Sequence, residues 1–470
     1  MCGVFGIYAP DRDVARLTYF ALYALQHRGQ ESAGIAVGDG RRITTQKELG
    51  LVPQVFDEVS LTALSGGLNA IGHTRYSTTG SSRWPNTQPV MRHRQGRTVA
   101  LGHNGNLTNT AELRTELAER GVRLETTSDT EVIAALICEH PGTLEEAVRD
   151  AMGRIHGAFS AVVADGAQVI AFRDPDGIRP LVLGDLDGAP VVASETCAFD
   201  IVGARYVCDI EPGQMAILDH HGPRVAQAQP VRQGGGAALC IFEFIYFARP
   251  DSRMDGVGLH AARVRMGERL AGEAPVDADV VISVPDSGTP AAQGYARAIG
   301  LPFADGLVKN RYVGRTFIQP EQGLREHGVK LKFNPIHDVI DGQRVIVVDD
   351  SIVRGSTTRK IVQMLFDAGA AEVHLRISSP PIVSPCYYGI DMAASDELIA
   401  ADRTLDEVRD SLGATSLAYL SLDGLQDATD RAGNRFCRAC LTRSYPTEIP
   451  DDLREGGRFR FEAPRPAPVG

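Results

Sequence analysis

The sequence contains no apolar run long enough to cross a membrane, and its N-terminus has no basic segment followed by an apolar one. Basic residues are fewer than acidic ones, and the formal net charge is −11. A net negative charge of this size argues against nucleic acid as a partner. Cysteine is sparse, and eight residues in 470 do not suggest a disulfide scaffold. We therefore expect a cytoplasmic protein, long enough for two domains that each bury a core.

The most informative stretch is 344–358, in which a buried strand ends in two acids. Four apolar residues, Val345 to Val348, are typical of a buried parallel strand. Asp349 and Asp350 follow, then a loop of Ser, Gly and Thr, and then a predicted helix over 358–366. Such a loop and helix N-terminus bind an anion through backbone N–H groups, whereas the acids suit ribose hydroxyls and a hydrated Mg²⁺. The alternative is a turn in which the two acids only cap a helix.

The second residue of the chain is a cysteine. Removal of Met1 would give Cys2 a free α-amine on the same residue as its thiol. An α-amine has a pKa of about 7.7–8.0 and can accept the thiol proton near neutrality, which makes the thiolate available as a nucleophile. The alternative is that Cys2 is only a small residue that permits removal of Met1.

Four further segments of the first half carry chemically useful side chains: Gln26 to Gly34, Ile71 to Thr78, Gly102 to Leu107, and Ser128 to Glu131. Together with Cys2, they resemble the glutaminase domain of class II amidotransferases. The resemblance implies an N-terminal nucleophile (Ntn) hydrolase fold, a four-layer αββα sandwich. His27 and His73 could suggest a Cys–His pair, but the family does not use one, and we expect both to be structural.

The resemblance assigns roles to individual residues of this half. Cys2 is the expected nucleophile, which attacks the side-chain amide of glutamine. The Asn104 side chain and the Gly105 backbone N–H match the oxyanion hole, which needs two donors where charge develops. Arg75 is expected to bind the α-carboxylate of glutamine, and Asp129 its α-ammonium group.

The second half resembles a type I phosphoribosyltransferase, whose substrate is phosphoribosyl pyrophosphate (PRPP). A strand over 280–284 runs into the tight turn 285–290, which is similar to the pyrophosphate loop of that family. Glycine in this turn lets backbone amides approach a diphosphate. The basic segment 309–316 is expected to close over PRPP as a lid that excludes water, although a solvated basic loop is the alternative. Mainly parallel pairing is expected in the sheet of this domain.

The resemblance implies a PRPP site built from these loops: Ser287, Gly288, Lys309, Arg311, Asp349, Asp350, Ser351, Arg354, Gly355, Ser356 and Thr357. Asp349 and Asp350 would lie at the ribose hydroxyls, and the loop that follows them would surround the 5-phosphate. Mg²⁺ would be bound near Ser287, Asp349 and Asp350.

Cys437 and Cys440 form a C-x-x-C pair. This spacing alone is also compatible with a thioredoxin-like site or with a zinc site. No tryptophan–cysteine context supports redox chemistry, and no histidine pair supports zinc. With Cys240 and Cys386 they match the iron–sulfur class of glutamine PRPP amidotransferases, in which four thiolates bind a 4Fe–4S cluster. Three others lie in apolar surroundings and are expected in the core: Cys138, Cys197 and Cys208.

The glycine run Gly234 to Gly236 is a flexible break, so we expect a glutaminase domain over 2–232 and a phosphoribosyltransferase domain over 233–447. The tail, 448–470, is expected to be mobile. Cluster-containing relatives often begin with a short propeptide before the cysteine. Here Met1 alone precedes Cys2, so we expect ordinary removal of Met1 to suffice; the alternative is that the native chain begins further upstream.

The combined resemblance implies transfer of ammonia from glutamine to carbon 1 of PRPP with loss of pyrophosphate, the first committed step of purine synthesis. It also implies a homotetramer inhibited by purine nucleotides. One alternative is another class II amidotransferase, such as a sugar-phosphate aminating enzyme, and the PRPP loops argue against it. A second is a non-catalytic PRPP-sensing regulator, which would have no reason to keep Cys2, Arg75, Asn104 and Gly105 together.

Overall fold

The computed structural model describes residues 1–77, 79–94, 96–231, 238–310, 332–392, 395–430, 436–456 and 461–462. The glycine run 234–236 and the expected boundary at 232 lie outside the described residues. So do Arg311 and all of the expected lid segment 309–316 beyond residue 310. No helix within the described ranges is both long and apolar enough to span a bilayer.

The first half contains two stacked antiparallel sheets. One has seven strands in the order β11-β9-β10-β1-β4-β2-β3: β1 (Gly3–Tyr8), β2 (Ser32–Gly38), β3 (Ile43–Leu49), β4 (Asn69–Arg75), β9 (Val182–Leu186), β10 (Ala189–Ala193) and β11 (Arg205–Asp209). The other has six in the order β13-β12-β8-β7-β6-β5: β5 (Val90–Arg94), β6 (Arg97–Leu107), β7 (Gly157–Ala164), β8 (Val169–Arg173), β12 (Gln214–Asp219) and β13 (Gly222–Gln227).

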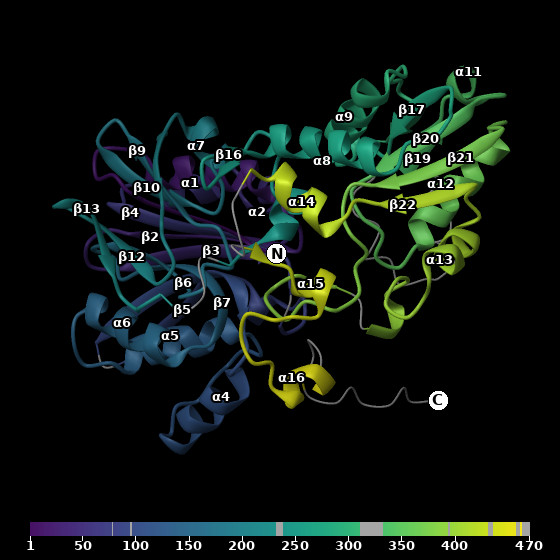
Figure 1. Ribbon diagram of the computed structural model, residues 1–470. Coiled ribbons are helices and arrows are strands. Elements are labelled where there is room, and N and C mark those ends of the chain that lie inside the picture. Colours follow the sequence, from purple (N-terminus) through teal and green to yellow (C-terminus); the bar gives the residue numbers. More distant parts are fainter. Residues whose placement is uncertain are drawn as a thin grey trace, which may run out of the picture.

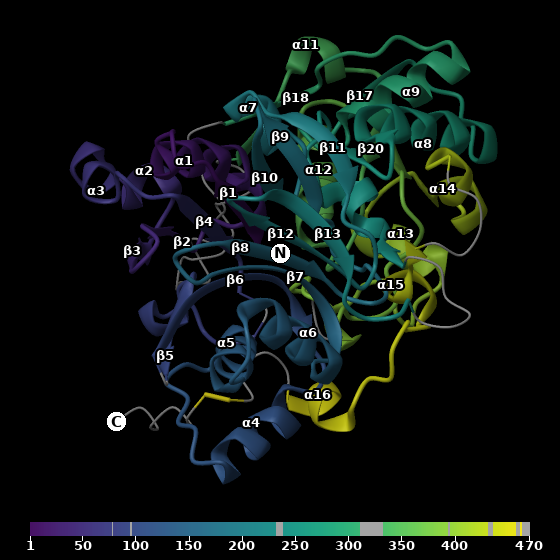
Figure 2. The same cartoon turned by 90° about the vertical axis from the view of Figure 1, so that its left-hand side faces the viewer.

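Helices cover the outer face of each sheet (Figures 1 and 2). On the seven-stranded side lie α1 (Val14–Ala24), α2 (Val52–Val55), α3 (Glu58–Ala63) and α7 (Cys197–Val202). On the six-stranded side lie α4 (Thr110–Glu119), α5 (Asp129–Glu139) and α6 (Leu144–Arg154). Successive residues of a strand point to opposite faces, so Val4 packs between the sheets while Phe5 packs under α1. The predicted four-layer αββα sandwich is confirmed.

The second half is built on a four-stranded parallel sheet in the order β17-β20-β21-β22: β17 (Val280–Ser283), β20 (Arg344–Asp349), β21 (Glu372–Ile377) and β22 (Ser416–Tyr419). One face carries α8 (Leu259–Glu273), α9 (Thr289–Ile299) and α14 (Leu422–Ala428), and the other carries α12 (Ser356–Asp367) and α13 (Leu405–Leu412). β18 (Leu307–Lys309) pairs with β19 (Phe333–Pro335), and α11 (His337–Ile340) follows.

The central strand of this sheet is buried on both faces, as its apolar run predicts. Ile346 and Val348 pack toward α8 and α9, whereas Val345 and Val347 pack toward α12 and α13, and all four are fully buried. The predicted helix after the two acids is α12, which starts at Ser356 rather than at 358. The mainly parallel sheet of the second half is confirmed.

The two halves meet around the N-terminus, which lies between them in Figure 1. The junction contains short elements of the second half: β14 (Leu239–Cys240), a π-helical turn η3 (Glu243–Phe247), β15 (Arg253–Met254), β16 (Val257–Gly258), β23 (Phe436–Cys437) and α15 (Ala439–Thr442). Met1 is buried in the same apolar cluster as Ile178 and Cys240, so residues of both halves share one core there.

The described part of the expected mobile tail is structured and contacts the first half. Helix α16 (Asp451–Gly456) lies beside α4 (Figure 2). The Glu462 carboxylate accepts hydrogen bonds from the Ser81 backbone N–H at 2.8 Å and from the Thr127 hydroxyl at 2.6 Å. Composition alone misses this, because the contacts depend on partners more than 300 residues away in sequence.

Candidate active sites

Cys2 lies immediately before β1 and is buried. Its backbone N–H donates to Asn104 Oδ1 at 3.2 Å, and its thiol lies 3.5 Å from the Tyr76 carbonyl. Burial raises the pKa of the Cys2 thiol, while the charges of the chain terminus and Arg75 act in the opposite direction. A nearby base is therefore needed to form the thiolate, which is the form that attacks an amide.

Asn104 and Gly105 lie on β6, directly beside Cys2. The Asn104 Oδ1 atom accepts the hydrogen bond from the Cys2 N–H. The Nδ2 atom of Asn104, by contrast, is buried and has no hydrogen-bond partner. A buried N–H group without an acceptor is costly, by about 1–3 kcal/mol. An anionic oxygen formed when the neighbouring thiol attacks an amide would supply the missing acceptor. This is the chemistry that the sequence predicts for Asn104.

A buried ion network holds the backbone of Cys2 from the other side. The Arg28 Nε atom donates to the Cys2 carbonyl at 2.9 Å, and its guanidinium also pairs with Glu195 and with Glu243. All three side chains are completely buried. Because Glu243 lies on η3 in the second half, this network ties Cys2 to both halves of the chain.

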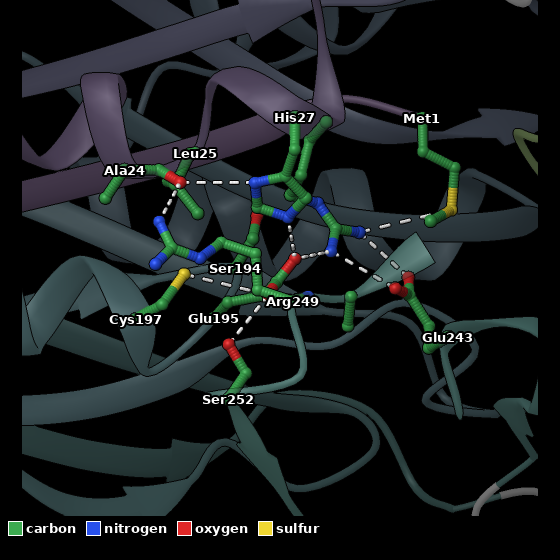
Figure 3. Close-up of polar contacts among 12 residues, drawn as sticks. Met1, Ala24, Leu25, His27, Ser194, Glu195, Cys197, Glu243, Arg249 and Ser252 are labelled. Carbon is green, nitrogen blue, oxygen red and sulfur yellow. Dashed lines mark hydrogen bonds and ion pairs between the residues drawn. The ribbon is translucent and has the colours of Figure 1, made fainter. Parts of the chain in front are cut away.

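Glu195 is the centre of that network (Figure 3). It accepts from His27 at 2.7 Å, from the Ser252 hydroxyl at 2.8 Å and from the Arg249 backbone N–H at 2.9 Å. Burial alone would raise its pKa, but His27, Arg28 and the Arg249 N–H outweigh that effect and hold the pKa well below the ordinary range. Glu195 is therefore ionised.

Arg28, Glu195 and Glu243 are not among the site residues predicted from the sequence. One signal was available for Glu243, which is the single charged residue in the apolar stretch 239–247. A lone acid in such a stretch is expected to have a buried cationic partner. The partner itself, 215 residues away, is visible only in the folded chain.

Arg75 and Asp129 both lie near this site and are engaged with protein groups. Arg75 ends β4, and its guanidinium donates to the Ser81 carbonyl at 3.1 Å and lies 3.7 Å from Glu31. Asp129 accepts from the Leu107 N–H at 3.0 Å and lies 3.7 Å from His103. Their roles in binding glutamine stay predictions.

His27 and His73, the two histidines expected to be structural, are hydrogen-bonded within the protein. His27 bonds to Glu195 and to the Ala24 carbonyl, and His73 bonds to the His103 carbonyl at 3.1 Å. Burial lowers the pKa of His73 to about 3, so it is neutral at physiological pH.

The second candidate site lies where β20 ends. Asp349 and Asp350 are adjacent, and burial raises the pKa of both, with mutual repulsion adding to the effect at Asp349. The Ser351 hydroxyl donates to Asp350, and the Ser287 hydroxyl lies close enough to lower its pKa. Adjacent acids of which Asp350 is buried and Asp349 half-buried are stabilised by ligands that donate hydrogen bonds or carry positive charge, such as sugar hydroxyls or a divalent cation.

Two glycines shape this site. A Cβ at Gly288 would lie 2.6 Å from the Val348 carbonyl oxygen, so only glycine lets the turn 285–290 approach the end of β20. Gly355 has a φ of +74° and forms the N-cap of α12 with no side-chain cap. Ser356 and Thr357 therefore begin the helix with N–H groups that no cap side chain occupies, and this geometry suits a phosphate.

Two basic residues of the predicted PRPP site, Lys309 and Arg354, are paired with acids in this structure. Lys309 lies 2.6 Å from Asp286, and Arg354 lies 2.8 Å from Glu397. Both pairs are partly exposed, so they contribute little stability and can exchange for a phosphate.

The four predicted cluster cysteines come together from distant parts of the second half. Cys240 and Cys437 are paired in register on β14 and β23. Cys440 follows on α15, and the Cys386 sulfur accepts from the Tyr388 N–H at 3.4 Å. Burial has the largest effect in raising the pKa of Cys440, and the charges of the other three cysteines raise it further. Within the described ranges, however, no three His, Cys, Asp or Glu side chains are arranged to hold a metal ion.

Of the other expected core cysteines, Cys138 and Cys197 are buried, whereas Cys208 is half-buried. Burial raises the pKa of Cys138 to about 11.

Two family models match the chain, a glutamine amidotransferase domain over 73–200 and a phosphoribosyl transferase domain over 261–378. An amidophosphoribosyltransferase of Synechococcus elongatus is 52% identical over 460 residues, covering 96% of this chain and 92% of the relative. That of Mycobacterium tuberculosis is 51% identical, with 97% and 88% covered. The solved glutamine PRPP amidotransferase of B. subtilis, complexed with ADP and GMP, is 46% identical with a TM-score of 0.89, covering 96% of this chain and 98% of that one.

Near-complete coverage at about 50% identity spans both candidate sites. It thereby excludes the alternatives in which only one half of the chain is of this type. This chain therefore belongs to the amidophosphoribosyltransferase family.

Proposed function

We propose that Cys2 and the strand end at Asp349–Asp350 carry the two half-reactions of this enzyme. The enzyme releases ammonia from glutamine and transfers it to carbon 1 of PRPP, giving 5-phosphoribosylamine, pyrophosphate and glutamate. The observation that carries the residue assignment is the buried, unpartnered Asn104 Nδ2 atom beside Cys2.

In the first half-reaction, the sulfur of Cys2 bonds to the amide carbon of glutamine. The amide oxygen becomes anionic and accepts from Asn104 Nδ2 and the Gly105 N–H. The carbon–nitrogen bond then breaks, ammonia leaves with the proton, and water hydrolyses the thioester to glutamate. After removal of Met1, the α-amine of Cys2 can accept the thiol proton, and Asn104 Oδ1 already contacts that nitrogen.

In the second half-reaction, ammonia attacks carbon 1 of PRPP and pyrophosphate leaves. Asp349 and Asp350 accept from the ribose hydroxyls, while the uncapped start of α12 binds the 5-phosphate. We propose Ser287, Asp349 and Asp350 as the residues that hold Mg²⁺, directly or through water. The oxygen donors and the raised pKa values of the acids fit a hard divalent cation, which would neutralise the leaving pyrophosphate.

The glutamine half-reaction is tested by replacing Asn104 with alanine. Pyrophosphate release from PRPP is measured with glutamine and then with ammonium. Loss of one oxyanion donor is expected to lower the glutamine-dependent kcat by about 100- to 1,000-fold and to leave the ammonium-dependent rate unchanged. Asn109→Ala, at the start of α4, is the matched control and is expected to behave as wild type. Equal loss with both nitrogen sources would contradict the assignment.

We also propose that Cys240, Cys386, Cys437 and Cys440 hold a 4Fe–4S cluster. Four buried or half-buried thiols from three segments lie close enough to influence one another. Beside them, the buried Arg179 Nη2 atom has no hydrogen-bond partner, and the cysteines help to raise the pKa of Arg179. A cluster with four thiolates is anionic, so a buried guanidinium with an unused N–H fits it.

Anaerobically purified enzyme is therefore expected to be brown and to contain about four irons per chain. Cys437→Ser is expected to lower the iron content strongly and to loosen the C-terminal segment, measured as faster hydrogen exchange over α15. Cys208→Ser, at a cysteine of the first half, is the control and is expected to keep its iron. Zinc instead of iron in the wild-type protein would overturn this proposal.

The proposed regulation rests on a solved relative, whereas the proposed assembly rests on the family resemblance alone. The solved B. subtilis relative is complexed with ADP and GMP, which supports purine nucleotides as inhibitors here. We further propose a homotetramer in the cytoplasm.

A further inference from the structure

One short segment of the second half, Cys386 to Gly389, packs directly against the strand that carries Asn104 and Gly105. We call it the 386–389 segment. The Tyr387 carbonyl accepts a hydrogen bond from Asn106 Nδ2 at 3.0 Å. The next carbonyl, that of Tyr388, accepts from Arg179 Nε at 2.8 Å. Both donors belong to the first half, and the Asn106 and Arg179 side chains are buried, so the contact forms inside the protein.

Gly389 makes the closest approach of this segment. It is buried, and its φ of +107° lies in the region that favours glycine. A Cβ at this position would lie 2.9 Å from the carbonyl carbon and oxygen of Gly105, where ordinary contact begins at 3.4 Å. The two backbones therefore touch with no side chain between them.

Gly105 is confined on its other side as well. On β7, the partner strand of β6, Ala158 presents a carbonyl with which a Cβ on Gly105 would collide. Gly105 has a φ of +150° and is thus held between β7 and the 386–389 segment. A displacement of β7 or of the 386–389 segment would change the direction of the Gly105 N–H group and the position of the neighbouring Asn104.

We propose that the 386–389 segment is a positioning element for the oxyanion hole of the glutaminase site, with Gly389 and the Tyr387 carbonyl as its contact points. This inference rests on the proposed function, in which Asn104 and Gly105 stabilise the oxyanion. The second half thereby supports the first half-reaction through backbone contacts that touch neither glutamine nor PRPP.

Such an element acts on the transition state more than on bound glutamine. The oxyanion donors are needed where negative charge develops, whereas glutamine in the ground state is held by its α-carboxylate and α-ammonium groups. A change at Gly389 is therefore expected to lower kcat with little effect on KM.

The test compares Gly389→Ala with Gly413→Ala in the full-length enzyme. Gly413 also has a positive φ, +74°, but a Cβ there would meet nothing within 4 Å, so it controls for backbone strain without a clash. Glutamate production is measured with saturating PRPP, beside ammonium-dependent synthesis. Binding of the γ-aldehyde analogue of glutamine is measured too, because its adduct with a cysteine thiol places an oxygen in the oxyanion hole.

A shift of about half an ångström at Gly105 is expected to lower the glutaminase kcat of Gly389→Ala by about 10- to 100-fold. Affinity for the aldehyde should fall by the same factor, while the KM for glutamine and the ammonium-dependent rate stay unchanged. Gly413→Ala should match wild type in every measurement. Wild-type glutaminase kinetics in Gly389→Ala, or an equal loss with ammonium, would overturn the inference.

A second variant keeps the test decisive if Gly389→Ala does not fold. Asn106→Asp keeps the acceptor for the Thr79 hydroxyl but replaces the donor to Tyr387 with a carboxylate oxygen. The same split between kcat and KM is expected, and its absence would count against the inference. If Asn104→Ala loses its glutamine-dependent activity while both segment variants are normal, only this inference fails. A fully active Asn104→Ala would instead refute the proposed oxyanion hole.

Discussion

Replacement of Cys2 with alanine is expected to abolish glutamine-dependent synthesis and to leave synthesis from ammonium intact. The variant lacks the sulfur proposed to attack the amide carbon, but the proposed PRPP site lies in the other half of the chain, on β20 and α12. Ammonium-driven activity should rise with pH, because protonated ammonia has no lone pair for carbon 1 of PRPP. The measurement is pyrophosphate release with each nitrogen source over a range of pH.

Cys138→Ala, at a buried cysteine on α5, is the matched control and should retain both activities if it folds. A Cys2→Ala variant that fails with ammonium would mean that Cys2 does more than attack glutamine.

Wild-type glutamate production should also depend strongly on PRPP if the two sites are coupled by enclosed transfer of ammonia. Equal glutaminase rates with and without PRPP would refute that coupling.

The combined change Asp349→Asn and Asp350→Asn is expected to abolish synthesis with glutamine and with ammonium alike. Both carboxylates are proposed to accept from the ribose hydroxyls and to hold Mg²⁺, and an amide replaces a charged acceptor with a neutral group. PRPP binding, measured by calorimetry with Mg²⁺, should be lost. Cys2 should still react with a glutamine analogue, because the first half is untouched.

The thermal stability of this double variant separates lost chemistry from lost folding. Burial raises the pKa of both acids in the folded state, so ionisation there is costly. Their favourable contribution to folding is complete below the unfolded-state pKa and is lost as pH rises through the folded-state pKa. At neutral pH without ligands, the neutral variant should therefore melt no lower than wild type.

Asp406→Asn with Asp410→Asn is the control, since both acids are exposed on α13 beside Arg409. Near-normal PRPP turnover by the Asp349–Asp350 variant would contradict the assignment of the strand end.

Local sequence determined the parts of this protein that depend on neighbouring residues. The apolar run Val345 to Val348 specifies a strand buried on both faces, and the Ser, Gly and Thr residues after Asp350 specify a loop and a helix start. The same holds for the chemistry proposed for Cys2, whose amine and thiol belong to one residue. Such features follow from backbone preference and hydrophobic periodicity, which act over a few residues.

Only the tertiary structure decided which distant groups meet. Glu243 pairs with Arg28 across 215 residues, and Gly389 touches Gly105 across a still longer separation. No local pattern encodes such pairs, because many alternative partners have the same charge or size. The positions of long side chains were likewise decided by packing: Lys309 reaches Asp286, and Arg354 reaches Glu397. Motifs could therefore name the candidate site residues, but the support proposed to come from the second half to the glutaminase site depends on the packing of the two halves alone.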